Sequence, residues 1–238
     1  MAKGGFSMAD ERNLDQENRW YWEQLALRCV ASLERNNIKA HYVPGREAAC
    51  SKVLDMIPPG VSIGVGDSVT LLQVGIIPAL EGRNCHQIFD PFRKDGESYF
   101  PPTLRQTAEI GKKAIAADVF LTGINAITLD GKLVNVDGFG NRVAGLVFGP
   151  KKVIAVAGVN KIVPDLDEAL KRIKGFAAPI NVKRHQLKHG LDRLPPCATS
   201  GICSDCTHPS RICCYTVIVE YQPRPRIEVV LIGEKLGI

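Results

Sequence analysis

The stretch DVFLTGINAITLDGKLVNVDGFGNRVAGLVFGPKKVIAVAGVNKIV, residues 118–163, decides the fold class. Two apolar runs in it, 119–122 and 153–157, lack the alternation of a half-exposed strand and therefore predict fully buried strands. Between them, the Asp-Gly pair at 130–131 predicts a hairpin turn, and residues 141–148 predict a helix. Buried strands that alternate with helices are typical of an α/β fold, in which helices flank a mainly parallel sheet on both faces.

Helices and strands alternate on both sides of this stretch as well. Periodic apolar residues predict helices, and Val, Ile and Leu runs predict strands. Toward the N-terminus the pattern predicts a helix, a strand and a second helix: 14–34, 38–43 and 47–57. Toward the C-terminus it predicts a helix over 166–174, which begins with the capping-box spacing of Asp165 and Glu168, and two closing strands, 216–221 and 226–233.

We expect one folded domain over residues 14–238, preceded by a flexible N-terminus, 1–13. The domain has an N-terminal helical part and, before the last two strands, a cysteine-rich segment, 197–214. The segment 84–103 contains two aspartates, a glycine and a Pro-Pro pair and predicts a loop that covers part of the molecule.

Composition excludes several classes of protein. With 238 residues, 45% hydrophobic and 23% charged, the chain is neither disordered nor fibrous. It has no apolar run near the ~20 residues that span a bilayer, and its N-terminus lacks an apolar signal-peptide core, so we expect a cytoplasmic protein without membrane contact. The net charge of +5 is spread along the chain and only 6% of residues are aromatic, which argues against nucleic-acid binding. A mild positive excess suits a small anionic metabolite.

Three loops that follow predicted strands are unusually rich in small and polar residues. A connecting loop needs only one glycine or asparagine to turn, and ligands collect at the carboxyl ends of parallel strands. We therefore expect these loops to form one pocket for a carboxylate or phosphate. The candidate ligand-binding residues are Gly64, Gly66, Ser68, Thr70, Gly123, Asn125, Asn141, Arg142 and Asn160. The alternative is an ordinary turn before a helix, with Asp67 or Ser68 as its N-cap.

Three residues in these loops are candidate catalytic residues. Asp67 and Asp137 are the carboxylates best placed to act as acid or base, and Lys161 supplies a positive charge. The chain has no G-x-G-x-x-G, no Walker sequence and no G-x-S-x-G, so the dinucleotide, triphosphate and hydrolase interpretations lack support.

Four cysteines near the C-terminus, Cys197, Cys203, Cys206 and Cys213, have the spacing Cys-x5-Cys-x2-Cys-x6-Cys. In a reducing compartment such a cluster indicates a metal before structural disulfides. Zinc prefers paired Cys-x2-Cys motifs and only one is present, so the spacing favours a [4Fe-4S] cluster, with zinc as the alternative. Free thiols in a loop are the third interpretation.

The same segments carry a resemblance to a known family. The chain from about Trp20 to Ile238 resembles the LUD-domain family of lactate-utilisation proteins, through VGDSVTL (65–71), most of the central stretch (120–163), CATSGICSDCTHPSRIC (197–213) and VVLIGEKLG (229–237). The resemblance implies a NagB/RpiA/CoA-transferase-like fold, in which residues 64–70 hold a substrate phosphate or carboxylate and Lys161 lies near a loop lysine of the relatives.

One position departs from the pattern of the isomerase-like relatives. Where they have a catalytic aspartate this chain has Asn125, which cannot take up a proton, and its loops contain no glutamate for a CoA-transferase reaction. Two functions therefore stay open. The first is an enzyme of L-lactate or related 2-hydroxy-acid oxidation with iron–sulfur partner proteins, favoured by the cysteines. The second is a non-catalytic metabolite-binding or regulatory subunit, favoured by Asn125. A homo-oligomer is compatible with either.

Overall fold

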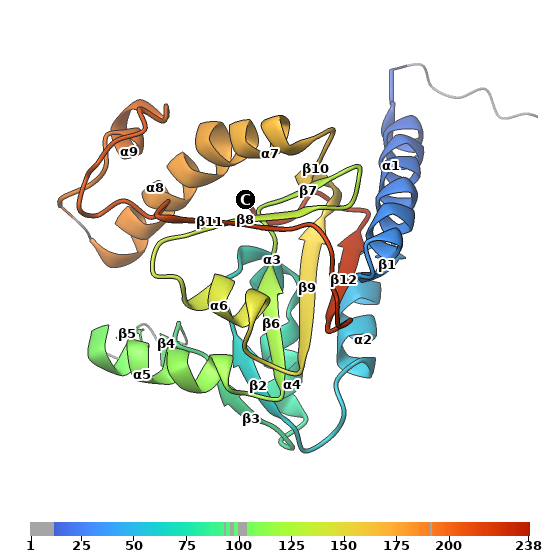
Figure 1. Ribbon diagram of the computed structural model, residues 1–238, viewed down its shortest axis with the longest axis horizontal. Helices are drawn as coiled ribbons and strands as arrows, with labels where there is room; N and C mark the ends of the chain where they lie inside the picture. Colours follow the sequence, from blue (N-terminus) through green and yellow to red (C-terminus); the bar gives the residue numbers. More distant parts are fainter. Residues whose placement is uncertain (1–11, 93, 96–97, 100–103, 191) are drawn as a thin grey trace, which may run out of the picture.

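The computed structural model describes residues 12–92, 94–95, 98–99, 104–190 and 192–238 (Figure 1). Residues 1–11 of the predicted flexible N-terminus, and seven positions within the predicted loop 84–103, lie outside this part. Among the described residues, no helix combines the length and the apolar character of a membrane span.

A six-stranded sheet forms the centre of the molecule, and each pair of neighbouring strands in it is parallel. In spatial order the strands are β1 (Lys39–Val43), β12 (Ile227–Ile232), β9 (Lys152–Gly158), β6 (Val119–Gly123), β2 (Ser62–Val65) and β3 (Gln87–Phe89). This confirms the predicted α/β class with a mainly parallel sheet. The loop prediction for 84–103 is wrong at β3 and at two paired two-residue strands, 94–95 and 98–99, all of which are too short for a periodic signal.

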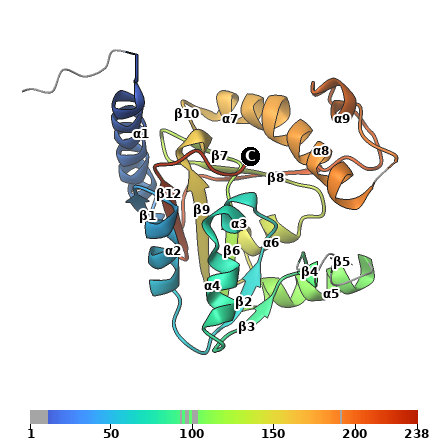
Figure 2. The same ribbon diagram turned by 180° about the vertical axis from the view of Figure 1, so that it is seen from behind.

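Side chains of the central strands alternate between two hydrophobic cores, one on each face of the sheet. In β9, Ala155 belongs to one core and Ile154 and Val156 to the other. The first core is closed by α1 (Asp15–Arg35), α5 (Leu104–Ile115) and α6 (Asn141–Val147). The second is closed by α2 (Arg46–Asp55), α3 (Val69–Val74) and α4 (Ile76–Gly82), which Figure 2 shows from behind. Burial on both faces explains why these strands read as continuous apolar runs.

A second, four-stranded sheet lies beyond the carboxyl ends of the central strands (Figure 1). Its order is β10 (Ile162–Val163), β7 (Ala126–Thr128), β8 (Leu133–Asp137) and β11 (Tyr215–Val219). The β7–β8 hairpin turns at Gly131, which has a positive φ of 87°, so the predicted Asp-Gly turn is confirmed. The sheet itself was not predicted, because β10 and β11 pair with strands that lie far away in the sequence.

Helices cover the outer face of this small sheet. Asp165 accepts a hydrogen bond from Glu168 N (2.9 Å), and this cap begins α7 (Leu166–Arg172). The chain continues through a π-helical turn (Ile173–Ala177) into α8 (Ala178–His189). The predicted end at residue 174 is therefore wrong, because the π-helical turn carries the helical chain on to Pro179 and the rest of α8. The remaining short elements are α9 (Cys197–Ser200), the 3₁₀ turn Val159–Lys161, and the paired strands β4 (Lys94–Asp95) and β5 (Ser98–Tyr99).

Gly64 of β2 should be intolerant of any side chain. A Cβ at this position would lie 2.0 Å from the carbonyl oxygen of Ala114 in α5. We expect Gly64→Ala to lower the free energy of unfolding by about 1–3 kcal/mol, measured by denaturant titration. In the matched control Gly111→Ala, a Cβ meets no atom within 4 Å, and the higher helix propensity of alanine should raise stability by about 1 kcal/mol. Equal effects of the two substitutions would contradict this packing.

Candidate functional site

The three polar loops meet at the carboxyl edge of the central sheet, because β2, β6 and β9 are parallel neighbours. Lys161 Nζ donates a hydrogen bond to Thr70 Oγ1 at 3.0 Å, which joins the loop after β9 to the helix after β2. Gly123 at the end of β6 lies against Ser68, since a Cβ there would be 2.5 Å from Ser68 Oγ. These contacts bring the three loops side by side at this edge, and the ligand pocket that the sequence analysis expected there stays a prediction.

Lys161 is a buried amine with no acidic partner among the described residues. Its side chain is only 4% exposed. Burial, and then the positive charges of Arg172 and Arg142, lower the pKa of Lys161 to about 7. Within the described part of the chain, no carboxylate lies within ion-pair distance of Nζ. At neutral pH the amine is therefore poised between its charged and neutral forms.

The guanidinium of Arg142 joins the two sheets. It donates to Gly123 O (3.2 Å) and Asn125 Oδ1 (2.9 Å) at the end of β6, and to Asn135 Oδ1 (2.7 Å) and Val136 O (2.7 Å) in β8. Burial lowers the pKa of Arg142, although the negative charges of Asp137 and Asp67 act to raise it. Asn135 itself is fully buried, and its Nδ2 has no hydrogen-bond partner. The Arg142 side chain therefore has a bracing role, and its charge contributes a positive field to the site.

Arg172 of α7 adds a second, half-buried guanidinium. It donates from Nη1 to Asn125 O (2.7 Å) and from Nε to Asn160 O (3.1 Å). Burial lowers its pKa as well. The predicted residues Asn125 and Asn160 are thus held by arginines, and Asn160 Oδ1 additionally accepts a bond from Leu236 N at 3.0 Å. Sequence reasoning did not single out Arg172, because an arginine near the end of a predicted helix is ordinary.

Both oxygens of Asp137 are engaged by backbone amides. Oδ1 accepts from Phe139 N (3.1 Å) and Gly140 N (3.2 Å), and Oδ2 accepts from Arg142 N and Val143 N (both 3.1 Å). This is the arrangement of a carboxylate that caps a helix start. The geometry favours a structural role for Asp137 at the beginning of α6 over the predicted catalytic one.

Asp67 pairs with helix α8. Arg184 donates to both of its carboxylate oxygens (3.0 Å each), and His185 Nε2 lies 3.8 Å from Oδ2. Burial raises the pKa of Asp67, but the hydrogen bonds and the charge of Arg184 outweigh burial and lower the pKa below its ordinary value. Burial lowers the pKa of His185 to about 4, so its ring is neutral at pH 7. Asp67 therefore stays ionised and paired, and α8, which was not predicted, supplies its partners.

The last residues of the chain cover Lys161. Gly237 N donates to Gln73 Oε1 at 2.6 Å, and a Cβ on Gly237 would lie 2.8 Å from Lys161 Nζ and 2.3 Å from Thr70 Oγ1. Figures 1 and 2 both place the end of the chain beside this edge of the sheet. The sequence analysis assigned this segment no part in the site. Its only local signal is Gly237, whose φ of +70° and close contacts suit glycine alone.

The other predicted ligand residues have distinct surroundings. Gly64 packs against α5, so we do not include it in the site. Gly66 lies beside Arg142, because a Cβ placed on Gly66 would be 3.0 Å from Arg142 Cγ. Ser68 caps α3 by accepting a bond from Leu71 N (3.3 Å), which is the ordinary turn considered as the alternative. Asn141 begins α6 and is half-buried.

The four predicted metal ligands line one narrow cavity. Cys197, Cys203, Cys206 and Cys213 enclose it together with residues of α8. Arg211 joins the two arms of the loop, because it donates to Cys206 O and, at 2.9 Å, to Cys213 O. It also lies 3.4 Å from Cys213 Sγ. The remaining thiol of the segment, Cys214, is exposed.

The donor set of this cavity fits a thiolate-bound metal chemically. Four soft sulfur donors suit zinc or an iron–sulfur cluster. Cys203 Sγ accepts a hydrogen bond from Asp205 N (3.4 Å), and Lys174, paired with Asp205 at 2.9 Å, brings a positive charge nearby. Burial, and then the charges of the other three thiols, raises the pKa of Cys197, as expected where thiols crowd together. In the described residues, however, no group of three or more His, Cys, Asp or Glu side chains is arranged to hold a metal ion.

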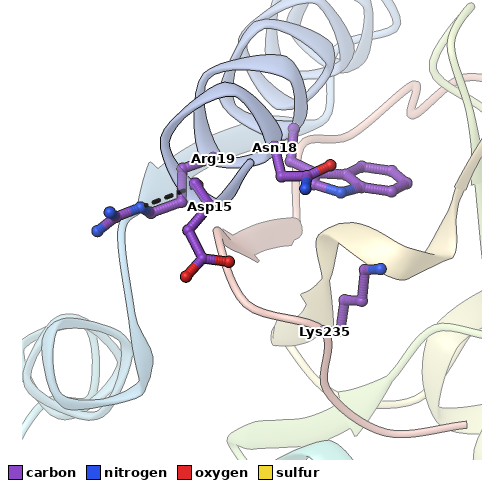
Figure 3. A pocket seen from close by; sticks show the side chains of 5 residues that line it. Asp15, Asn18, Arg19 and Lys235 are labelled. Carbon is purple, nitrogen blue, oxygen red and sulfur yellow. Dashed lines mark hydrogen bonds between the residues drawn. The ribbon is translucent and has the colours of Figure 1, made fainter. Parts of the chain in front are cut away.

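A further pocket lies between α1 and the C-terminal segment (Figure 3). Asp15, Asn18, Arg19 and Trp22 line it from α1, and Lys235 lines it from the opposite side, with Nζ 5.6 Å from the centre of the Trp22 ring. No residue of the predicted site lines this pocket.

Comparison with known proteins gave one family and several solved structures, two of which are described below. The model of the LUD domain family matches residues 27–232. One similar structure is that of a DUF162 family protein from Deinococcus radiodurans, with a sequence identity of 12% and a TM-score of 0.44. The match covers 90% of this chain and 98% of that chain. Another is that of ribose 5 phosphate isomerase A from Neisseria gonorrhoeae, with a sequence identity of 16% and a TM-score of 0.33. The match covers 61% of this chain and 65% of that chain. No curated protein matches the chain.

Lys161→Met should change how stability depends on pH. In the native protein the pKa of Lys161 is about 7, against 10.5 for an ordinary lysine. Between these values the unfolded chain binds a proton that the native protein does not, so the wild-type protein gains stability relative to the variant as the pH rises from about 7 to 10.5. Denaturant titrations across this range measure the effect. For the exposed control Lys112→Met, the free energy of unfolding should depend on pH as it does for wild type. The same pH dependence for Lys161→Met and wild type would contradict the burial argument.

Proposed function

The chain belongs to the LUD domain family, and from this premise we propose that it is a cytoplasmic lactate-utilisation protein with two centres. The carboxyl-edge site binds a small carboxylate or phosphate, with L-lactate or a related 2-hydroxy acid as the ligand class. The cysteine cavity holds a metal centre. The observation that carries the proposal is the buried Lys161, which has Thr70 as its hydrogen-bond partner and no carboxylate nearby among the described residues.

The charge balance of the carboxyl-edge site supports an anionic ligand. Three cations, Lys161, Arg142 and Arg172, lie at this edge. The carboxylate of Asp67 is paired with Arg184, and that of Asp137 accepts four backbone N–H bonds and lies 3.9 Å from Arg142 Nε. A bound carboxylate would offset the cost of burying positive charge at this edge. Thr70 Oγ1 and Ser68 Oγ are the hydroxyls beside it that would bind the ligand oxygens.

Ligand entry at Lys161 requires the end of the chain to move. Gly237 lies so close to Lys161 and Thr70 that even a methyl group would collide with them. Residues 236–237 are held there by Asn160 and Gln73, whereas Glu234 is anchored firmly by Arg46 (2.6 Å). The segment from residue 236 onward would therefore open while Glu234 keeps its place, and closure over the ligand would exclude water.

The cysteine cavity would hold either an iron–sulfur cluster or zinc through Cys197, Cys203, Cys206 and Cys213. A cluster would supply one-electron transfer, and partners would then be iron–sulfur redox proteins. The residues of this chain would stabilise the thiolate forms: Asp205 N–H at Cys203 Sγ, and the Arg211 guanidinium at Cys213 Sγ.

A second candidate function is a metabolite-binding subunit without catalysis. It is favoured by the amide of Asn125, which is held between Arg142 Nη2 and Val136 N (2.9 Å each), and by the pairing of Asp67 with Arg184. Under this function no carboxylate in the site is free to accept a proton. Lactate oxidation assayed with an artificial electron acceptor separates the two: a binding subunit binds lactate without turning it over.

Ligand affinity should depend on Lys161 and Thr70. We expect Lys161→Met and Thr70→Val to weaken binding of lactate or inorganic phosphate at least tenfold, about 1.4 kcal/mol, measured by isothermal titration calorimetry. Lys112→Met, on an exposed helix surface, is the control and should bind as wild type does. Unchanged affinity in Lys161→Met would remove the basis of the proposed site.

Metal content should depend on the four cysteines of the cavity. In protein purified without oxygen, Cys206→Ser should lower bound iron or zinc at least severalfold, measured by elemental analysis, because a lost thiolate weakens the whole site. Cys85→Ser, an exposed thiol outside the cavity, should keep the metal. Broad visible absorbance identifies a cluster and a colourless zinc protein identifies the alternative. Wild-type protein without either metal would refute this centre.

A further inference from the structure

We propose that Lys161 forms a covalent imine with the ketone carbon of a 2-oxo acid, the oxidised counterpart of a 2-hydroxy acid. This inference rests on the proposed function, because it uses the same site and the same carboxylate recognition. It adds a chemical step and names a substrate class that anion binding alone does not require.

The surroundings of Lys161 are those of a nucleophilic amine. An amine attacks a carbonyl only in its neutral form, and burial next to other cations is one way in which proteins obtain this form. Lys161 is 4% exposed, and Arg142 of α6 and Arg172 of α7 are the charged groups that act on it. Together with burial they lower its pKa to about 7, so that a large share of the amine is neutral at physiological pH.

A purely structural role explains these surroundings less well. A buried lysine that only stabilises a fold ordinarily pairs with a carboxylate, because an unpaired buried charge is costly. Asp137, a carboxylate of the neighbouring loop, has its oxygens taken up by four backbone amides. In the part of the chain that the structure describes, the acidic groups at this edge are engaged elsewhere, and the amine has one hydroxyl as its hydrogen-bond partner, that of Thr70.

The step balances without an oxidant or reductant. The Nζ lone pair attacks the ketone carbon and forms the C–N bond, while the carbonyl electron pair moves to oxygen. Two protons pass from nitrogen to that oxygen, which leaves as water, and the C=N bond remains. Thr70 Oγ1, 3.0 Å from Nζ, is placed to relay a proton. The positive field of Arg142 and Arg172 favours a substrate whose ketone carries a carboxylate.

The experiment traps the imine by reduction. The full-length protein is incubated with pyruvate and treated with sodium borohydride, and the product is examined by intact mass and peptide mapping. We expect one reduced pyruvyl group per chain, on Lys161. Lys161→Arg and Lys161→Met should lose it, and Lys112→Arg should keep it. Acetone, a neutral ketone, should react more slowly than pyruvate, and lactate, which has no ketone, should give no adduct but should compete.

Other outcomes decide against the inference. If calorimetry shows that pyruvate binds wild type and no adduct is trapped, the imine is wrong while the proposed anion site stands. If neither lactate nor pyruvate binds, the proposed function fails together with it. An adduct of equal yield in Lys161→Met, or one spread over exposed lysines, also overturns the inference. Circular dichroism of both Lys161 variants excludes unfolding as the reason for a lost adduct.

Discussion

The buried guanidinium of Arg142 is the interaction on which the arrangement of the two sheets depends. Its four hydrogen bonds reach the end of β6 and the middle of β8, so they hold the small sheet over the carboxyl edge of the large one. A lysine could not replace it, because only the planar fork of arginine donates in several fixed directions at once. Asp137 in turn fixes the backbone of Arg142, since its carboxylate accepts the Arg142 N–H.

This construction has an electrostatic consequence for the site. The positions of Arg142 and Arg172 are fixed by the hydrogen bonds that connect the elements of the fold, so their positive charges are fixed at the carboxyl edge as well. Burial is the larger cause of the lowered pKa of Lys161, and the positive charges of these arginines add to it, so the neutral form of the amine is stabilised. The scaffold and the proposed chemistry thus have one physical origin.

The cysteine cavity is connected to the same place. Cys214 N donates to Asp137 O at 2.9 Å, where β11 begins to pair with β8, and Gly138 packs closely against Ile212. The loop that carries the four thiols therefore ends on the residue that caps α6. If a metal ordered the cysteine loop, the position of Asp137 would change with it, and so would that of Arg142, whose backbone N–H Asp137 accepts.

Local patterns in the sequence determined the central sheet, most of its helices and the Asp-Gly hairpin, because burial on both faces and helical periodicity leave a direct trace in the order of residues. They also singled out the loops that meet at Lys161 and the four thiols that line one cavity. Only the tertiary structure decided which groups face one another. Asp67 pairs with Arg184, which lies 117 positions later in the sequence, and Gly237 covers Lys161. Such pairings carry no periodic signal, since they arise when packing closes long loops of chain, and packing depends on the whole molecule at once.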